Sequence, residues 1–501
     1  MGTILKINAN RLIITWMAIS LPAAAANFSK AENKATRWPS HIQVVLDATK
    51  PLKYDRGERL PLYLWQAMDP GQLDDEPRPS KTGRDETTEE LVKELNKRGV
   101  GLISSWNPTN RQESLAQSLM IAKAQKKLNL RVNINATRCL YSFFNGDEQT
   151  AHIDDDGKSF WDESFGEQKI GCPFALDFRR PHVREQLEYF IQEFKKADLD
   201  VDFIFADWEI DGPIEFNEAH AASMRCKRCR ENISDIDDFE EFQEVLRKLR
   251  CQLQRDVYAE PMKENFPGVL VGNYGVYPHN GYRYWYDYYE YYVDGQPYQA
   301  DERAKYRKWY HEFPETGYTF AMPVVYTWRR IFDWYDYADT DYRWFYNMLL
   351  VASNAGRHTS AEIPIISFVH WHTIEAEPST GTAKQFSEEK YQELLWHILL
   401  RGTDTFFLWC RKQEAAKEIQ LVHQVYAEAQ QYGEFLSNGK PINFGVPKQP
   451  GTVISGLKLE GRILVRRTDF KKTSEPVEIV VDDKRIKVGA APGQCQIVSI
   501  P

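Results

Sequence analysis

The chain has 501 residues, of which 42% are hydrophobic and 13% aromatic, and this length predicts one large domain with a smaller one beside it. Its formal net charge is −9 at pH 7. The acidic balance and the lack of a DNA- or RNA-binding motif exclude a basic surface for nucleic acid. No motif indicates a cofactor, so we expect none.

The first 26 residues have the pattern of a secretory signal peptide. Lys6 and Arg11 precede the apolar run LIITWMAISL, and the small-residue stretch PAAAAN suits cleavage near Ala25 or Ala26. The apolar run is too short for a membrane span, and no second run of about 20 apolar residues follows. We therefore expect a secreted or periplasmic protein with no membrane span after cleavage.

Residues 27–57 are expected to form an N-terminal extension with a strand at 41–48. From residue 58 onwards, short apolar stretches alternate with amphipathic ones. The expected strands are 60–66, 101–106, 131–137, 201–206, 268–278, 319–328, 363–372 and 403–410. The expected helices include 87–99, 111–129, 180–198 (with Pro181 in its first turn), 236–264, 341–355 and 387–400.

Eight strands that alternate with helical segments predict an α/β fold, a (β/α)8 TIM barrel over residues 58–435. Residues 436–501 alternate apolar and polar side chains with period two, which predicts a small C-terminal all-β domain of antiparallel strands. Barrel enzymes place their sites on the loops that follow the strands.

The cysteine pattern contains one close pair, Cys226-x-x-Cys229, among seven cysteines. A zinc knuckle requires two more ligands at near spacing, and Cys251 alone does not complete it. The pattern favours a local disulfide or plain thiols over a metal site, and no other spacing indicates a metal. The expectation is therefore that the chain holds no metal.

The expected fourth barrel strand ends in an unusual way, in VDFIFADWEIDGP at residues 201–213. Asp207 and Glu209 are two residues apart, so on a strand their side chains share a face, about 6.5 Å apart along the chain. Neighbouring carboxylates split their pKa values and so supply an acid and a base. The alternative is that both are solvated acids at the start of a loop.

Aromatic residues recur where the expected strands end. Aromatic rings at a barrel mouth suit stacking on sugars, although a single such ring more often belongs to core packing. The candidate substrate-binding rings are Trp65, Trp106, Tyr274, Tyr277, Trp328, Trp371 and Trp409, with Tyr326 as a further site residue. Arg329, together with Arg138, Arg330 and Arg411, suits an anionic polysaccharide.

Several short motifs at the ends of the expected strands resemble those of the hyaluronidase family of glycoside hydrolases, with the chitinases as more distant relatives. The resemblance rests on ADWEI after the fourth strand, GNYGVYPHNG after the fifth, PVVYTW at the sixth and FFLWC at the eighth. It departs from the family where IDGP replaces an arginine–proline continuation. Phe205 also stands where the chitinase signature has its middle aspartate.

The resemblance implies a role for each matching residue. Glu209 would be the general acid and then the base, and Asp207 would assist the substrate's own acetamido group, which attacks in place of an enzyme nucleophile. Tyr326 would hydrogen-bond the acetamido carbonyl, and Trp409 would form the floor of the sugar subsite.

Two other interpretations remain open. A retaining two-carboxylate glycosidase would place its nucleophile after the seventh strand, where Glu375 and Glu377 are available. A non-catalytic barrel would bind carbohydrate without cleaving it, but such a protein has no need of the Asp207–Glu209 pair. The sequence indicates no oligomeric state.

Overall fold

The computed structural model describes residues 38, 40–65, 85–140, 144–163, 168–209, 211–215, 219–283, 292–293, 296–297, 307–308, 310–328, 340–374, 385–409, 415–471 and 473–501. The expected signal peptide, residues 1–26, lies outside this part of the chain. No helix among the described residues is long and apolar enough to cross a membrane.

Parallel strands form a closed (β/α)8 barrel. They are β1 (Leu62–Trp65), β2 (Val100–Gly101) continued by β3 (Ile103–Ser105), β4 (Asn133–Asn135), β7 (Phe203–Ala206), β8 (Leu270–Asn273), β13 (Val324–Trp328), β14 (Ile366–Ile374) and β15 (Thr405–Trp409). The hydrogen-bonded order is β3-β4-β7-β8 in one sheet and β13-β14-β15-β1-β2 in the other. Backbone bonds from Thr319 to Val271 (2.8 Å) and from Met322 to Val276 (3.0 Å) link β8 to the segment before β13.

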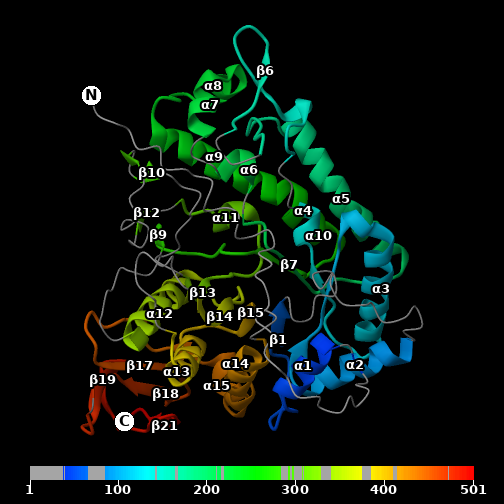
Figure 1. Cartoon of the computed structure of the whole chain (residues 1–501). Helices are drawn as coiled ribbons and strands as arrows, with labels where there is room; N and C mark the ends of the chain where they lie inside the picture. The colour runs from blue at the N-terminus through cyan, green and yellow to red at the C-terminus, as the bar shows by residue number, and fades with distance from the viewer. Residues whose placement is uncertain are drawn as a thin grey trace, which may run out of the picture.

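Helices surround the barrel (Figure 1). The main ones are α2 (Asp85–Lys97), α3 (Arg111–Lys127), α5 (Leu176–Lys196), α9 (Phe239–Gln254), α12 (Thr340–His358), α13 (Glu388–Leu399) and α14 (Ala415–Ala429). The helix expected at 236–264 is broken by a π-helical segment, η4 (Arg255–Ala259), before α10 (Glu260–Asn265). Helix α5 begins at Leu176, so Pro181 lies inside the helix and not in its first turn.

The shorter elements lie in the connections. They are η2 (Pro108–Asn110), α4 (Thr137–Leu140), η3 (Glu148–Thr150), β5 (His152–Ile153), β6 (Ser159–Phe160), α6 (Gly212–Glu215), α7 (Ala219–Arg225), α8 (Lys227–Asn232), β9 (Tyr282–Arg283), β10 (Tyr292–Val293), β11 (Gln296–Pro297), β12 (Arg307–Lys308), α11 (Phe313–Thr316), η7 (Gln430–Tyr432) and α15 (Gly433–Asn438).

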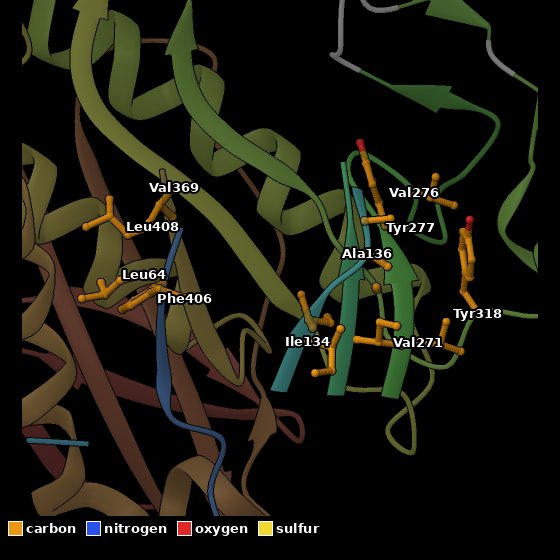
Figure 2. Packing of buried hydrophobic residues seen from close by; sticks show 14 of the residues in the cluster. Leu64, Ile134, Ala136, Val271, Val276, Tyr277, Tyr318, Val369, Phe406 and Leu408 are labelled. Carbon is orange, nitrogen blue, oxygen red and sulfur yellow. The ribbon is translucent and has the colours of Figure 1, made fainter. Parts of the chain in front are cut away.

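Alternate residues of the barrel strands supply two separate cores. The interior cluster comprises Leu60, Tyr63, Trp65, Ile103, Phe203, Phe205, Tyr274, Phe320, Met322, Val324, Tyr326, Ile366, Phe368, Phe407 and Trp409. The rings of Tyr63 and Phe203 stack across the barrel at 4.3 Å between centroids. The residues between them along the strands, such as Leu64 and Leu408, point outward to a second core under the helices (Figure 2).

The strand expected at 41–48 is wrong, because Ser40–Ala48 is helix α1. Ile42, Val45 and Thr49 are buried, and spacings of three and four residues place them on one helical face. This helix packs against α14. The buried positions of this apolar run therefore follow the period of a helix.

The C-terminal region is all-β, as expected. It comprises β16 (Lys440–Pro441), β17 (Thr452–Leu459), β18 (Arg462–Asp469) and β21 (Cys495–Ser499) in one antiparallel sheet, and the hairpin β19 (Val477–Val481) with β20 (Lys484–Val488). This sheet lies beside α13 (Figure 1). Polar contacts fasten the two: His397 bonds Ser455 at 2.8 Å, and Arg466 forms a buried ion pair with Glu393.

Candidate active site at the barrel mouth

Asp207 and Glu209 continue the inward-facing positions of β7 beyond its carboxyl end. Phe203 and Phe205 belong to the interior cluster, so the period of two brings residues 207 and 209 to the same side. Trp208, between them, is 1% exposed and packs in the outer core. Both acidic residues are partly buried. The buried Trp208 side chain therefore anchors the segment, and the residues on either side of it carry the carboxyl groups.

Hydrogen bonds hold the backbone of this segment in place. Asn273 of β8 accepts from the Trp208 N–H at 2.8 Å and donates to the Trp208 carbonyl at 3.0 Å. Arg250 of α9 donates to the carbonyls of Trp208 (3.0 Å) and Glu209 (3.1 Å). The Thr137 hydroxyl accepts from the Asp207 N–H at 2.8 Å. Residues from three other elements thus determine where the two carboxyl groups lie.

Two buried tyrosines face the carboxyl groups. The hydroxyls of Tyr274 and Tyr326 are 2.7 Å apart. Burial raises the pKa of Tyr326 well above its usual value, and the charges of Glu209 and Asp207 raise it further. The pKa of Tyr274 rises for the same reasons, with the Tyr326 phenol as an additional cause. Both phenols therefore stay protonated and can donate hydrogen bonds next to the carboxylates.

Asp207 differs from an exposed carboxyl group. Its Oδ1 atom is shielded from solvent and has no hydrogen-bond partner among the described residues. Burial raises the pKa of Asp207 from 3.8 to about 7. Because desolvation disfavours the charged form, this group can hold a proton close to neutral pH.

Aromatic rings complete this end of the interior. The Tyr326 ring lies 5.8 Å from the Trp409 ring and 5.9 Å from the His370 ring, and the Trp65 ring meets Phe205 edge-on at 5.6 Å. His370 Nδ1 lies 2.9 Å from both the Trp409 carbonyl and a carboxylate oxygen of Glu418. Both partners are acceptors, so Nδ1 carries the proton and donates. The imidazole is thereby fixed beside Trp409.

Three of the aromatic residues expected at the mouth pack in or against the outer core. Trp106 is completely buried and stacks at 5.4 Å on Phe190 of α5. Tyr277 lies in the same outer core. The Trp371 indole donates at 2.8 Å to the Phe386 carbonyl just before α13. Trp106 and Tyr277 thus pack in the outer core and the Trp371 indole is held by a backbone carbonyl; a substrate-binding role for these rings stays a prediction.

Several predicted residues lie outside what the structure describes. Arg329, Arg411, Glu375 and Glu377 are among them, as is most of the tyrosine-rich stretch 281–299. Trp328 ends β13 in register with Ile374, and its side chain is not described. Arg138 is exposed on α4.

Sequence reasoning missed Asn273, Arg250 and Glu418, which position the site residues. Glu418 is an acidic residue at a buried position of α14. An acidic residue at a buried helix position is the one sign in the sequence that Glu418 has a structural partner. That sign can be recognised only once it is known which face of α14 is buried.

Of the two states expected for the cysteine pair, the local disulfide is wrong, and free thiols are what the structure has. The six cysteines that the structure describes are all free, so Cys226 and Cys229 form no local disulfide. They lie with His152 and Cys172 in one cluster whose potential ligand atoms are all within 4.8 Å of one another. The ligands that seemed to be missing come from a segment more than 50 residues earlier in the chain.

Comparison with models of protein families finds no match to this chain. Comparison with curated proteins finds none either.

Solved structures with some likeness include alpha-L-fucosidase isoenzyme 2 from Paenibacillus thiaminolyticus, with a TM-score of 0.43 and 12% identity over 76% of this chain and 51% of the fucosidase. An alpha-amylase from Lactobacillus plantarum has a TM-score of 0.41 and 11% identity over 91% and 99% of the two chains. Bee venom hyaluronidase has a TM-score of 0.29 and 13% identity over 54% and 81%.

The chain spans about half the length of the fucosidase that it matches. At these TM-scores the likeness carries no argument about activity or family membership. The assignment of the (β/α)8 barrel rests on the strand order described above.

Proposed function

We propose that the protein is a glycoside hydrolase that binds carbohydrate at the carboxyl end of the barrel, with Glu209 as its general acid and base. The observation that carries the proposal is the continuation of the inward face of β7 from Phe203 and Phe205 into Asp207 and Glu209. A pair of carboxyl groups beside buried phenols at this end of a barrel strand suits acid–base chemistry on a bound ligand. A protein that only binds sugar gains nothing from burying Asp207.

The proposed mechanism uses the substrate's own 2-acetamido group. Its carbonyl oxygen attacks the anomeric carbon while Glu209 protonates the departing glycosidic oxygen. Asp207 accepts a hydrogen bond from the acetamido N–H, and the Tyr326 hydroxyl donates one to the acetamido carbonyl. Glu209 then removes a proton from the water that opens the cyclic intermediate. The short Tyr274–Tyr326 contact supports this role for Tyr326, since it orients that hydroxyl.

Trp409 and Trp65 are the proposed aromatic floor for the sugar. Both belong to the interior cluster, and Trp409 lies against Tyr326. Sugar C–H groups pack on such rings through apolar area. An anionic polymer, carboxylated or sulfated, remains part of the proposal through Arg329, which lies outside the described residues.

The test compares the wild type with Glu209→Gln and Asp207→Asn on acetamido-containing, uronic and sulfated polysaccharides, and measures new reducing ends. Loss of the ionisable group that donates and then accepts the proton is expected to lower kcat at least ~100-fold in Glu209→Gln. Asp198→Asn is the matched control, because the Asp198 side chain is fully exposed and distant from the mouth. It should retain wild-type activity.

Three outcomes would redirect or end the proposal. Cleavage confined to polymers without an acetamido group would exclude substrate assistance and make Glu375 and Glu377 the nucleophiles to replace. Binding of oligosaccharide without any cleavage would indicate a non-catalytic barrel. Activity that survives both substitutions would place the reaction elsewhere.

We further propose that the protein is exported, on the strength of its N-terminal pattern. Sequencing the N-terminus of the protein from the medium or periplasm should show cleavage after Ala25 or Ala26. A retained residue 1 would contradict it.

A further inference from the structure

Four potential metal ligands from two loops meet in one buried cluster. His152 starts β5, Cys172 follows the β5–β6 hairpin, Cys226 precedes α8 and Cys229 lies in the first turn of α8. All four side chains are 0% exposed. Figure 1 shows α7 and α8 beside the hairpin of β6, at the top of the view. We propose that these four residues bind one zinc ion as a structural site.

The spacing of the ligand atoms suits a tetrahedral ion. The Cys172 Sγ lies 3.5 Å from the Cys229 Sγ and 3.8 Å from the Cys226 Sγ. The His152 Nδ1 lies 4.0 Å from the Cys229 Sγ. Zinc–sulfur bonds of about 2.3 Å at tetrahedral angles separate two sulfurs by about 3.8 Å. A disulfide requires about 2.05 Å. The sulfurs are therefore at the separation of shared ligands and not of bonded partners.

The ligand set has the chemistry of zinc. Three thiolates and one imidazole form a Cys3His set, and the Cys-x-x-Cys spacing supplies two of its members. All four tetrahedral positions would be filled by the protein, and the cluster is closed to solvent. Structural zinc sites are closed in this way, whereas catalytic sites leave one position for water. The site is thus separate from the proposed chemistry at Glu209.

The local core around the cluster is built from small side chains. Its local core of fully buried apolar residues consists of the three cysteines and Ala175, with Phe160, Phe174 and Ile236 partly buried against it. Small side chains bury little apolar area, and regions with a small core depend on disulfides or metals for stability. A bound ion would supply the cohesion that large hydrophobic residues provide elsewhere in this chain.

The two loops that the ion would join follow β4 and β7, and the second of them carries the candidate carboxyl groups. A second link lies closer to the mouth. Arg179 donates to the carbonyl of Pro173, next to Cys172, and forms an ion pair with Asp211 in which both side chains are almost fully buried. The metal and this ion pair together would fix the loop that leaves Glu209.

The experiment measures the zinc content of the purified full-length protein and of two alanine variants. The wild type is expected to hold about one zinc per chain, and Cys229→Ala should hold at least ~10-fold less. Cys251→Ala is the matched control, because Cys251 is an equally buried free thiol on α9, outside the cluster. Zinc-free wild-type protein, or equal zinc in both variants, would overturn the proposal.

Two measurements on the wild type cover the case in which Cys229→Ala does not fold. Replacement by Co²⁺ should give the absorption of a tetrahedral thiolate site, and an octahedral spectrum would contradict the site. Alkylation of chelated, denatured, unreduced protein should label Cys172, Cys226 and Cys229. An unlabelled pair among them would show a disulfide and exclude the ion.

Discussion

Asn273 holds both backbone groups of Trp208, accepting from its N–H at 2.8 Å and donating to its carbonyl at 3.0 Å. Beyond the end of β7, the Asn273 side chain from β8 thereby takes the place of the backbone partner that a neighbouring strand would supply. Asn273 is completely buried, so no water can take over these bonds. The position of Asp207 and Glu209, on either side of Trp208, depends on this amide together with the bonds from Arg250 and to Thr137.

Asn273→Ala should therefore destabilise the fold and impair the site. It leaves the buried Trp208 N–H without a bond, which costs about 1–3 kcal/mol, while the Trp208 carbonyl keeps its bond from Arg250 at 3.0 Å. Asn273→Asp keeps the acceptor but places a buried carboxylate against the Trp208 carbonyl, so it should destabilise the fold as well. Urea unfolding monitored by Trp fluorescence would measure both, with Asn232→Ala as the control, because Asn232 is exposed. Equal stability of Asn273→Ala and the wild type would contradict this role.

Asp207 imposes a cost on stability that depends on pH. Its folded pKa, about 7, lies above the ordinary 3.8, so the folded chain binds more protons than the unfolded chain between about pH 4 and pH 7. The free energy of unfolding falls as the pH rises through that window, and the full cost is present above it.

Asp207→Asn removes this cost, since its amide never ionises. We expect the variant to gain ~1–3 kcal/mol of stability at pH 8 and clearly less at pH 4.5, although it loses activity. Chemical unfolding at the two pH values measures the difference. Asp198→Asn loses only an exposed ion pair with Lys126, so any change in its stability should be the same at both pH values. A gain of the same size at both pH values would show that the charge of Asp207 is not its cause.

Much of the fold could be predicted from the sequence, because the strand positions and their period follow from local patterns of apolar residues. The face that each aromatic ring takes could not be predicted, both for Trp106 just after β3 and for Trp371 within β14. Trp106 and Trp371 each stand one position away from the inward series, and a shift by one residue moves a side chain to the opposite face.

The cluster of His152 with the three cysteines could not be predicted from the sequence, for a different reason. Its members are brought together by the packing of two loops. The spacing of residues within one loop does not indicate which residues of the other loop lie beside them. The same holds for Asn273 and Arg250, whose partners are backbone groups of a distant segment.

Trp106 packs in the outer core and Trp409 in the barrel interior, so substituting them should have different effects on stability and on substrate binding. Trp106→Phe leaves a small cavity in the outer core and should lower the free energy of unfolding by about 1–3 kcal/mol, with KM unchanged. Trp409→Ala removes a ring of the proposed subsite and should raise KM about 10-fold. Steady-state kinetics beside urea unfolding distinguishes them. A raised KM in Trp106→Phe would return that ring to the binding site.

The pair of phenols at the mouth provides the last prediction. Tyr326→Phe and Tyr274→Phe remove the same hydrogen bond between the two hydroxyls, so each should cost about 1 kcal/mol of stability. Their effects on kcat should differ, because the proposal assigns the contact with the reacting acetamido group to Tyr326. We expect kcat to fall ~10–100-fold in Tyr326→Phe and only a few-fold in Tyr274→Phe, where the remaining hydroxyl loses its orientation. Tyr54→Phe, at an exposed position, is the control. Equal losses in the two mouth variants would mean that the phenols act as one unit, and a larger loss in Tyr274→Phe would transfer the role to Tyr274.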